Sequence, residues 1–208
     1  MMWQVITGFD PTVLSAFIIA GLVLNLTPGP DFLFISASGI SGGPRIGMAA
    51  AIGVNFGVTL HILLAATGVS AVLLAYPASY TAIKYIGAAY LAYLAVQAWR
   101  STSDIGTGHA APNAEKAIKR GFITNVLNPK TMLFIFAFIP QFTDPAIGPI
   151  WIQILILGVI FQFFGFLFVI VLGCASGLFA NALRTRVTIL NKISAIVFGG
   201  LAAKLVID

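Results

Sequence analysis

The chain has 208 residues, of which 59% are apolar and only 8% carry a formal charge, against roughly 25% in a soluble globular domain. Its mean hydropathy is +1.02. Between Arg45 and Arg100 the only formally charged residue is Lys84, and between Asp144 and Arg184 there is none. Each interval far exceeds the roughly 20 apolar residues that one membrane span needs, so the composition excludes an ordinary soluble domain and predicts a membrane protein.

The net charge of +5 does not indicate a nucleic-acid partner. The basic residues are scattered at the ends of apolar segments rather than gathered with aromatic residues on one face. The single cysteine, Cys174, excludes an internal disulfide bond and a cysteine-based metal cluster. No Lys or Arg precedes the first apolar stretch, as the basic region of a cleavable signal peptide would, so we expect the first helix to be retained.

The apolar segments predict an all-α membrane protein with six transmembrane helices in a single domain, residues 1–208. The first segment is too long for an unbroken, untilted span, so we expect it to be kinked or tilted. The one polar loop, residues 101–116, separates a first repeat, about 10–100, from a second, about 117–207. A five-span version, in which one broken helix re-enters without crossing, is the main alternative. The predicted spans are residues 11–40, 46–75, 80–99, 117–142, 150–178 and 187–206.

Two stretches repeat each other at an offset of one hundred residues. Residues 17–37 and 117–137 are identical at seven of twenty-one positions, and each contains a helix breaker within an apolar run. The breakers are Thr27-Pro28-Gly29-Pro30 in the first copy and Asn128-Pro129 in the second. Paired broken helices at corresponding positions of two halves are the sequence pointer to the binding site of a secondary transporter. We therefore predict that helices 1 and 4 are broken near the midplane and that the protein moves a solute across a membrane.

The distribution of Lys and Arg predicts the orientation. If the 101–116 loop is cytoplasmic, eight basic residues lie on that side and only Lys84 and Lys204 on the other, with both termini outside. Three spans per half then make the two repeats inverted relative to each other. The eight residues predicted to be cytoplasmic are Arg45, Arg100, Lys116, Lys119, Arg120, Arg184, Arg186 and Lys192.

The prolines predict what the breaks can bind. Pro28, Pro30 and Pro129 lack a backbone donor and leave carbonyl groups one turn back without partners. Such groups are tolerated at membrane depth only where protein or a water-filled cavity satisfies them, so the breaks should face inward. The helices that restart there present N-termini suited to an anion such as a carboxylate, and Thr27 and Asn128 are good N-cap residues for them.

Two charged residues follow the breaks. Asp31 and Lys130 lie one position apart in the repeat alignment, and charges at this depth are rare and usually face a partner or a cavity. They form either a structural ion pair between the halves or a site for an ammonium and a carboxylate group, which together describe an amino acid. His61 is either a proton carrier or a ring hydrogen-bonded to a neighbouring helix. Asn25 and Asn125, one turn before each break, can bond the freed carbonyls or a ligand.

The remaining features predict packing. The seventeen phenylalanines are expected to face lipid. Glycines spaced by four residues let helices approach closely and are compatible with a homodimer. These glycines are Gly43 with Gly47, Gly53 with Gly57, and Gly173 with Gly177.

Five groups of residues stand out as motifs: Thr27-Pro28-Gly29-Pro30, Gly43-Pro44-Arg45-Ile46-Gly47 with Gly53 and Gly57, Ile83 to Leu91, Gly121 to Lys130, and Pro140-Gln141-Phe142. Together these motifs resemble the LysE/RhtB family of amino-acid exporters, over residues 10–205. The resemblance implies a multi-pass efflux carrier of the bacterial inner membrane, driven by the proton gradient, for homoserine, threonine, leucine and related neutral amino acids. The residues that match the marked positions of that family are Pro28, Gly29, Pro30, Asn128, Pro129 and Lys130.

Three other classes fit the residues less well. An intramembrane enzyme needs a nucleophile with a base, or metal ligands, and a thiol-redox carrier needs a cysteine pair, whereas the chain has two His and one Cys. We therefore expect no catalytic residues, no metal and no cofactor. The alternative is an efflux carrier for another small solute or for a divalent cation on the same scaffold. Hard cations favour several oxygen ligands, whereas Asp31 is the only carboxylate expected inside the membrane.

Overall fold

The structure, a computed structural model, describes residues 2–76, 78–100 and 113–207, and the side chains of these except residues 2–4 and 176–187. The described part is helical and contains no strand. The helices are α1 (Met2–Gly8), α2 (Pro11–Leu26), α3 (Pro30–Leu64), α4 (Ser70–Ala75), α5 (Ser79–Arg100), α6 (Ala114–Val126), α7 (Pro129–Leu133) and α8 (Ile150–Ile207). Short π-helical or 3-10 segments cover Ala65–Val69, Phe134–Phe138, Ile139–Phe142 and Pro145–Ile147.

Both predicted helix breaks are present. After α2 the backbone is extended at Thr27, and α3 begins at Pro30. After α6 the chain turns, and the stretch Pro129–Phe142 continues at 52° to α6. The prolines at these positions cannot continue the preceding helix, because each lacks an N–H and clashes with the turn before it.

Two boundaries differ from the prediction. The chain begins with the short helix α1, which was not predicted. The helix predicted to begin near residue 117 is α6, and it starts at Ala114. The side chain of Asn113 caps it by accepting from the amide of Lys116 at 2.9 Å. Residues 101–112 of the predicted polar loop lie outside the described part.

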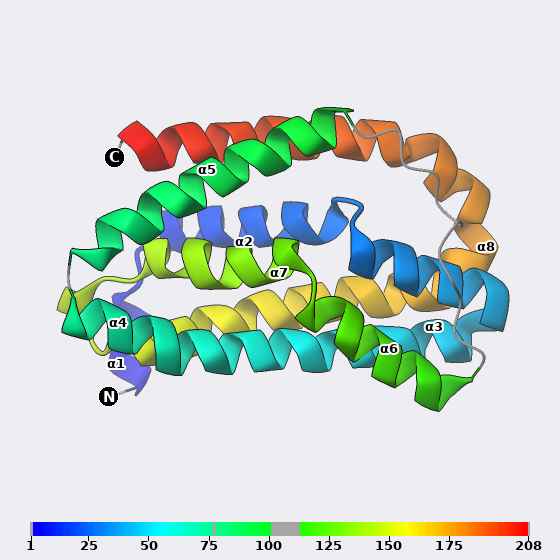
Figure 1. Ribbon diagram of the computed structural model, residues 1–208, viewed down its shortest axis with the longest axis horizontal. Helices are drawn as coiled ribbons and strands as arrows, with labels where there is room; N and C mark the ends of the chain where they lie inside the picture. Colours follow the sequence, from blue (N-terminus) through cyan, green and yellow to red (C-terminus); the bar gives the residue numbers. More distant parts are fainter. Residues whose placement is uncertain (1, 77, 101–112, 208) are drawn as a thin grey trace.

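The turn predicted between the first two spans lies inside α3. Gly43 has φ 74° and ψ −179°, a conformation that glycine adopts without the steric penalty of a Cβ. Figure 1 shows the two limbs of α3 on either side of this turn running in opposite directions. The second limb continues through the π-helical segment into α4, which makes one apolar stretch, Pro30–Ala75.

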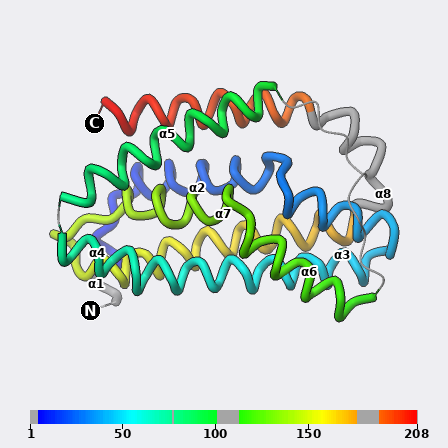
Figure 2. Tube along the Cα trace, in the orientation of Figure 1, coloured from blue at the N-terminus to red at the C-terminus, as the bar shows by residue number. Residues whose placement is uncertain are grey.

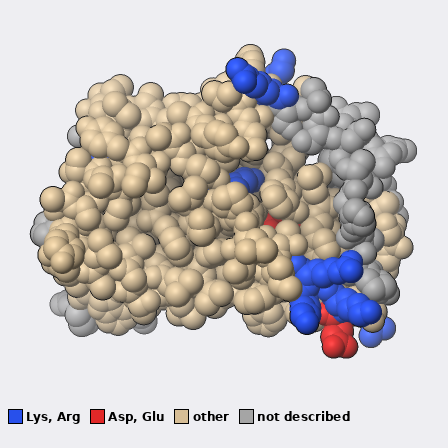
Figure 3. Space-filling model, viewed as in Figure 1, with Lys and Arg blue, Asp and Glu red and all other residues tan. Residues whose placement is uncertain are grey.

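The long helices lie side by side in three rows (Figures 1 and 2). The C-terminal part of α8 runs beside α5 along one edge, α2 and α7 lie in the middle, and the first part of α8 runs beside the second limb of α3 along the opposite edge. The two ends of the chain lie at the same end of the long axis. On the face shown in Figure 3, Lys and Arg side chains gather over the half of the molecule that lies away from the two chain ends.

Three described stretches are long and apolar enough to cross a membrane, and the bent pair of α6 with Pro129–Phe142 makes a fourth if it counts as one span. The three are Pro30–Ala75, Ile150–Ala175 and Thr188–Ile207. This agrees with an all-helical membrane protein, whereas the six-span inverted arrangement stays a prediction.

The core is rich in phenylalanine, so the prediction that the phenylalanines face lipid is wrong for many of them. Phe17, Phe134, Phe138 and Phe198 are fully buried. The ring centroids of Phe134 and Phe138 are 4.7 Å apart at a tilt of 32°, within the range in which aromatic pairs attract. Composition alone does not distinguish these rings from those exposed on the outside, such as Phe163.

Glycines allow the helices to cross closely, as predicted. A Cβ added to Gly47 would stand 2.1 Å from the carbonyl oxygen of Gly173 on α8, and one on Gly53 would stand 2.1 Å from that of Ile118 on α6. Gly43 is the exception, since it serves the turn and has nothing near its Cβ position. The predicted partner of Gly173, Gly177, lies outside the described side chains.

Candidate functional site

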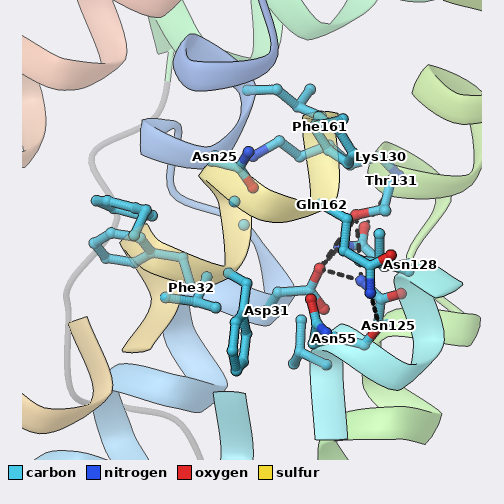
Figure 4. A pocket seen from close by; sticks show the side chains of 18 of the residues that line it. Asn25, Asp31, Phe32, Asn55, Asn125, Asn128, Lys130, Thr131, Phe161 and Gln162 are labelled. Atoms are coloured by element: carbon cyan, nitrogen blue, oxygen red, sulfur yellow. Dashed lines mark hydrogen bonds between the residues drawn. The ribbon is translucent and has the colours of Figure 1, made fainter. Parts of the chain in front are cut away.

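Asp31 lies in the first turn of α3, directly after the first break, and its carboxylate faces the second break (Figure 4). Its Oδ2 accepts hydrogen bonds from Asn125 Nδ2 at 2.8 Å, Asn128 Nδ2 at 2.7 Å and Thr131 Oγ1 at 3.2 Å. Its Oδ1 is buried and has no hydrogen-bond partner. One oxygen is therefore held by the protein, and the other remains able to accept a hydrogen bond.

Lys130 follows Pro129 at the start of α7, and its side chain reaches back to the first break. Its Nζ donates to the backbone carbonyl of Thr27 at 2.5 Å. The ion pair between Asp31 and Lys130 that we considered is not formed in the described structure, because each charge has other partners. Each break thus supplies the charged residue that bonds the other.

The two predicted N-cap residues differ in role. Asn128 caps α7 as predicted, with its Oδ1 accepting from the amide of Lys130 at 3.0 Å. Thr27 does not cap α3, where the N-cap is Gly29 without a side-chain bond. Instead Thr27 ends α2, and its hydroxyl lies 2.6 Å from both the carbonyl of Val23 and the hydroxyl of Ser194 on α8. Pro28 and Gly29 separate Thr27 from the first turn of α3, so Gly29 and not Thr27 occupies the N-cap position.

His61 is hydrogen-bonded to a neighbouring helix, which was one of its two predicted roles. Its Nε2 lies 3.2 Å from the backbone carbonyl of Asn125, the group that in an unbroken helix would accept from residue 129, where Pro129 has no donor. The amide of Asn128 also bonds this carbonyl, at 2.9 Å. His61 is buried and does not line the cavity beside Asp31.

The two asparagines that match in the repeat make similar close contacts. Asn25 donates to the carbonyl of Gly21 at 2.9 Å and lies against Gly165 of α8, where a Cβ would stand 3.0 Å from its Nδ2. Asn125 lies against Gly57 of α3, where a Cβ would stand 2.5 Å from its Oδ1. Each therefore occupies space that only a glycine on the facing helix leaves open.

A cavity of about 40 Å³, here called the site cavity, lies between these helices. That is room for roughly two or three water molecules. Of the predicted site residues it is lined by Asn25, Thr27, Gly29, Asp31, Asn125, Asn128 and Lys130.

A second cavity of about 300 Å³ lies on the other side of the breaks and is here called the tyrosine chamber. Pro28, Pro30 and Pro129 line this chamber rather than the site cavity, together with Tyr90 and Tyr93 of α5. Figure 3 shows the molecule hollowed in the middle of this view, with basic and acidic side chains visible inside.

Sequence reasoning missed several residues that line the site cavity. Asn55, Thr131, Phe161 and Gln162 all do so, and Figure 4 shows Asn55 and Gln162 near Asp31. Gln162 donates to the hydroxyl of Thr59 at 2.7 Å, which joins α8 to α3. The signal that could have found Asn55 and Gln162 is their polarity within long apolar spans, since such residues mostly face the interior of a helix bundle.

The site cavity presents one carboxylate, one ammonium group and several amides. Groups of these kinds can pair with a positive and a negative group of a small molecule. Among the residues that the structure describes, no three His, Cys, Asp or Glu side chains lie together where they could hold a metal ion.

An all-helical membrane fold with two broken helices around a polar cavity is the architecture of a transport protein. The sequence profile described as LysE type translocator matches residues 22–208. The chain therefore belongs to the LysE family, and it is a transporter rather than an enzyme.

Its relatives include named efflux proteins. The chain is 28% identical to a leucine efflux protein of Enterobacter sp. (strain 638) over 91% of this chain and 92% of the relative. It is 32% identical to a homoserine/homoserine lactone efflux protein of Salmonella typhimurium, over 69% and 70%. It is also 33% identical to an uncharacterized membrane protein of Vibrio cholerae over 72% and 74%. No solved structure matches the chain.

Proposed function

We propose that this protein exports neutral amino acids, of the leucine, homoserine or threonine type, from the bacterial cytoplasm across the inner membrane in exchange for protons. The names of the relatives support an amino acid or a close derivative as substrate. The site cavity supports a substrate with one positive and one negative group, because it contains Asp31 and Lys130 and otherwise uncharged side chains.

The observation that carries this proposal is the placement of the two charges. Asp31 keeps one buried oxygen without a partner, where the α-ammonium group of an amino acid can donate. Lys130 donates to a backbone carbonyl, a neutral acceptor that a substrate carboxylate can replace with a stronger, charge-assisted bond. The lack of further charges in the cavity lining favours neutral side chains on the substrate.

Proton coupling follows from the use of a single carboxylate. Asp31 binds either a proton or the ammonium group of the amino acid, so each release of substrate outside leaves the carboxylate able to carry a proton inward. The bonds from Asn125, Asn128 and Thr131 to Oδ2 hold the other oxygen in place during this exchange.

Alternating access would move one three-span repeat against the other. Asn25 packs against Gly165 of α8 and Asn125 against Gly57 of α3, so each matched asparagine supports the proposal by meeting a glycine of the other half. In this proposal α2 slides on α8 as α6 slides on α3, and the site cavity opens in turn to the cytoplasm and to the outside.

The test is efflux from proteoliposomes that contain the purified protein, across a panel of amino acids and with divalent cations as the competing class. We expect leucine, homoserine or threonine to be moved uphill when a pH gradient is imposed, and a protonophore to abolish the movement. Transport of divalent cations but of no amino acid would refute the proposal. Amino-acid transport that a protonophore leaves unchanged would refute only the proton coupling.

A further inference from the structure

The site cavity and the tyrosine chamber share one wall. Thr27, Gly29, Asn128 and Lys130 line both cavities, so the two are separated only by the breaks themselves. The site cavity has room for a few waters, whereas the tyrosine chamber, at about 300 Å³, reaches the lower end of the volumes of small-molecule sites. Of these two cavities, only the chamber is large enough for an amino acid in this conformation.

The movable part of this wall is the side chain of Lys130. It lies against Gly29, where a Cβ would stand 3.3 Å from its Cδ and 3.4 Å from its Nζ. Gly29 has an extended backbone, with φ −163°, so its lack of a side chain matters for space rather than for conformation. The ammonium group at the end of the Lys130 side chain donates a hydrogen bond to the carbonyl of Thr27. A competing anion can break this bond.

The other side of the wall is fixed to the rest of the molecule. The hydroxyl of Thr27 bonds Ser194 in the C-terminal part of α8, and both residues are buried. Asn128 is held by its bonds to Asp31 and to the amide of Lys130. The side chain of Lys130 is therefore the part of the shared wall that can move while Thr27 and Asn128 keep their bonds.

The chamber has the chemistry of a site for a small amphipathic anion. Tyr90, Tyr93 and Gln97 bring polar groups to it and Leu94 an apolar surface, and Gln97 Nε2 donates to the Tyr93 hydroxyl at 3.4 Å. Arg100 ends α5 one turn beyond Gln97. A charge about 5 Å further along the helix axis lies within the Debye length and attracts a carboxylate.

We propose that the tyrosine chamber is the subsite through which the amino acid reaches the site cavity, and that Lys130 is the gate between them. The carboxylate of the amino acid replaces the carbonyl of Thr27 as partner of Lys130 Nζ, which frees the lysine from the wall. Because Arg100 lies on the side predicted to be cytoplasmic, the chamber loads from the cytoplasm. This inference rests on the proposed amino-acid export.

The single cysteine of the chain makes a direct test possible. In a Cys174→Ala background, Ala98→Cys places a thiol in the chamber wall. Gln97→Cys places a second one at an exposed position that also lines the chamber, so the test does not depend on a buried substitution. Val96→Cys is the matched control, at the same depth of α5 but outside the chamber and 50% exposed.

Each variant is reconstituted and treated with a charged, membrane-impermeant thiol reagent from either face, with or without L-leucine or L-homoserine. We expect cytoplasmic labelling of the cysteines at positions 97 and 98. An amino acid at about ten times its Kd should slow this labelling about elevenfold, by mass action. Labelling should also block export, whereas the reaction of the cysteine at position 96 should not depend on the amino acid.

The proposal is overturned if neither amino acid slows labelling at positions 97 and 98, or if labelling comes only from the outer face. Export at the unlabelled rate after complete modification overturns it as well. If the unlabelled Cys174→Ala protein exports neither amino acid while the wild-type chain also exports none, the proposed function itself has failed, which separates the two outcomes.

Discussion

Replacing Asp31 with Asn should uncouple export from the pH gradient and leave the protein folded. Three donors converge on Oδ2 at 2.7, 2.8 and 3.2 Å, and the carbonyl oxygen of Asn can accept from the same three. Each bond changes from a charged to a neutral acceptor, which weakens it by about 1 kcal/mol. Removing a charge from the membrane interior gains about 3 kcal/mol. The new amide nitrogen takes the place of Oδ1, which has no partner, and a buried donor left unpaired costs about 1–3 kcal/mol. Together these effects should lower the free energy of unfolding by about 1–3 kcal/mol.

The assay is export from proteoliposomes with an imposed pH gradient, beside exchange of labelled for unlabelled amino acid without a gradient. The Asp31→Asn variant should lose the response to pH, since an amide cannot carry the proton. The matched control is Asp10→Asn, which makes the same chemical change at the N-cap of α2, where Asp10 bonds the amides of Thr12 and Val13 and where Asn is an equally good cap. Uphill export by Asp31→Asn at the wild-type rate would show that Asp31 is not the proton site, and His61 would be the next candidate.

Three further predictions concern binding, packing and orientation. Lys130→Ala should raise the Kd for the amino acid about 10- to 100-fold, because a bond to a charged group contributes about 1.5–3 kcal/mol; unchanged binding by calorimetry would contradict its role. Gly57→Ala should cost about 1–3 kcal/mol of stability and impair export, since its Cβ would stand 2.5 Å from Asn125 Oδ1. Gly68→Ala meets nothing within 4 Å and should lower neither stability nor export in thermal unfolding and export assays. Reporter fusions in residues 101–112 should report a cytoplasmic location, and an external signal would reverse the predicted orientation.

The breaks could be predicted from the sequence because their cause is local. Pro28, Pro30 and Pro129 end the preceding helix by removing a donor and by a steric clash within the same turn, so no knowledge of the fold is needed. The same holds for the cap of Asn128 on the amide of Lys130, two residues away. The internal repeat then indicated that both breaks belong to one site, and Asp31 does face the second break.

The partners of the charges could not be predicted, because they depend on how distant segments pack. Opposite charges near each other in an alignment suggest an ion pair, yet Asp31 bonds two amides and a hydroxyl. Lys130 bonds a carbonyl instead. A proline break leaves backbone carbonyl groups without donors from their own helix, and these groups compete for other donors nearby. The carbonyl of Thr27 is one of them, and it accepts a hydrogen bond from Lys130. The bond between Thr27 and Ser194 joins residues 167 positions apart, beyond any local pattern.

The exchange of bonds between the breaks explains how a substrate could control movement of the two halves. Four hydrogen bonds that involve a charged group join the first break to the second. Asp31 accepts three of them and Lys130 donates the fourth. Breaking the Lys130 bond without replacement would cost about 1.5–3 kcal/mol. A ligand shifts such an equilibrium only by its differential affinity for the two states. In the proposed cycle an amino acid supplies that difference at Lys130, because its carboxylate replaces the carbonyl of Thr27, while its ammonium group engages Oδ1 of Asp31 and leaves the three bonds to Oδ2 in place. An unloaded carrier has no replacement for the Lys130 bond, so this bond would oppose movement without cargo.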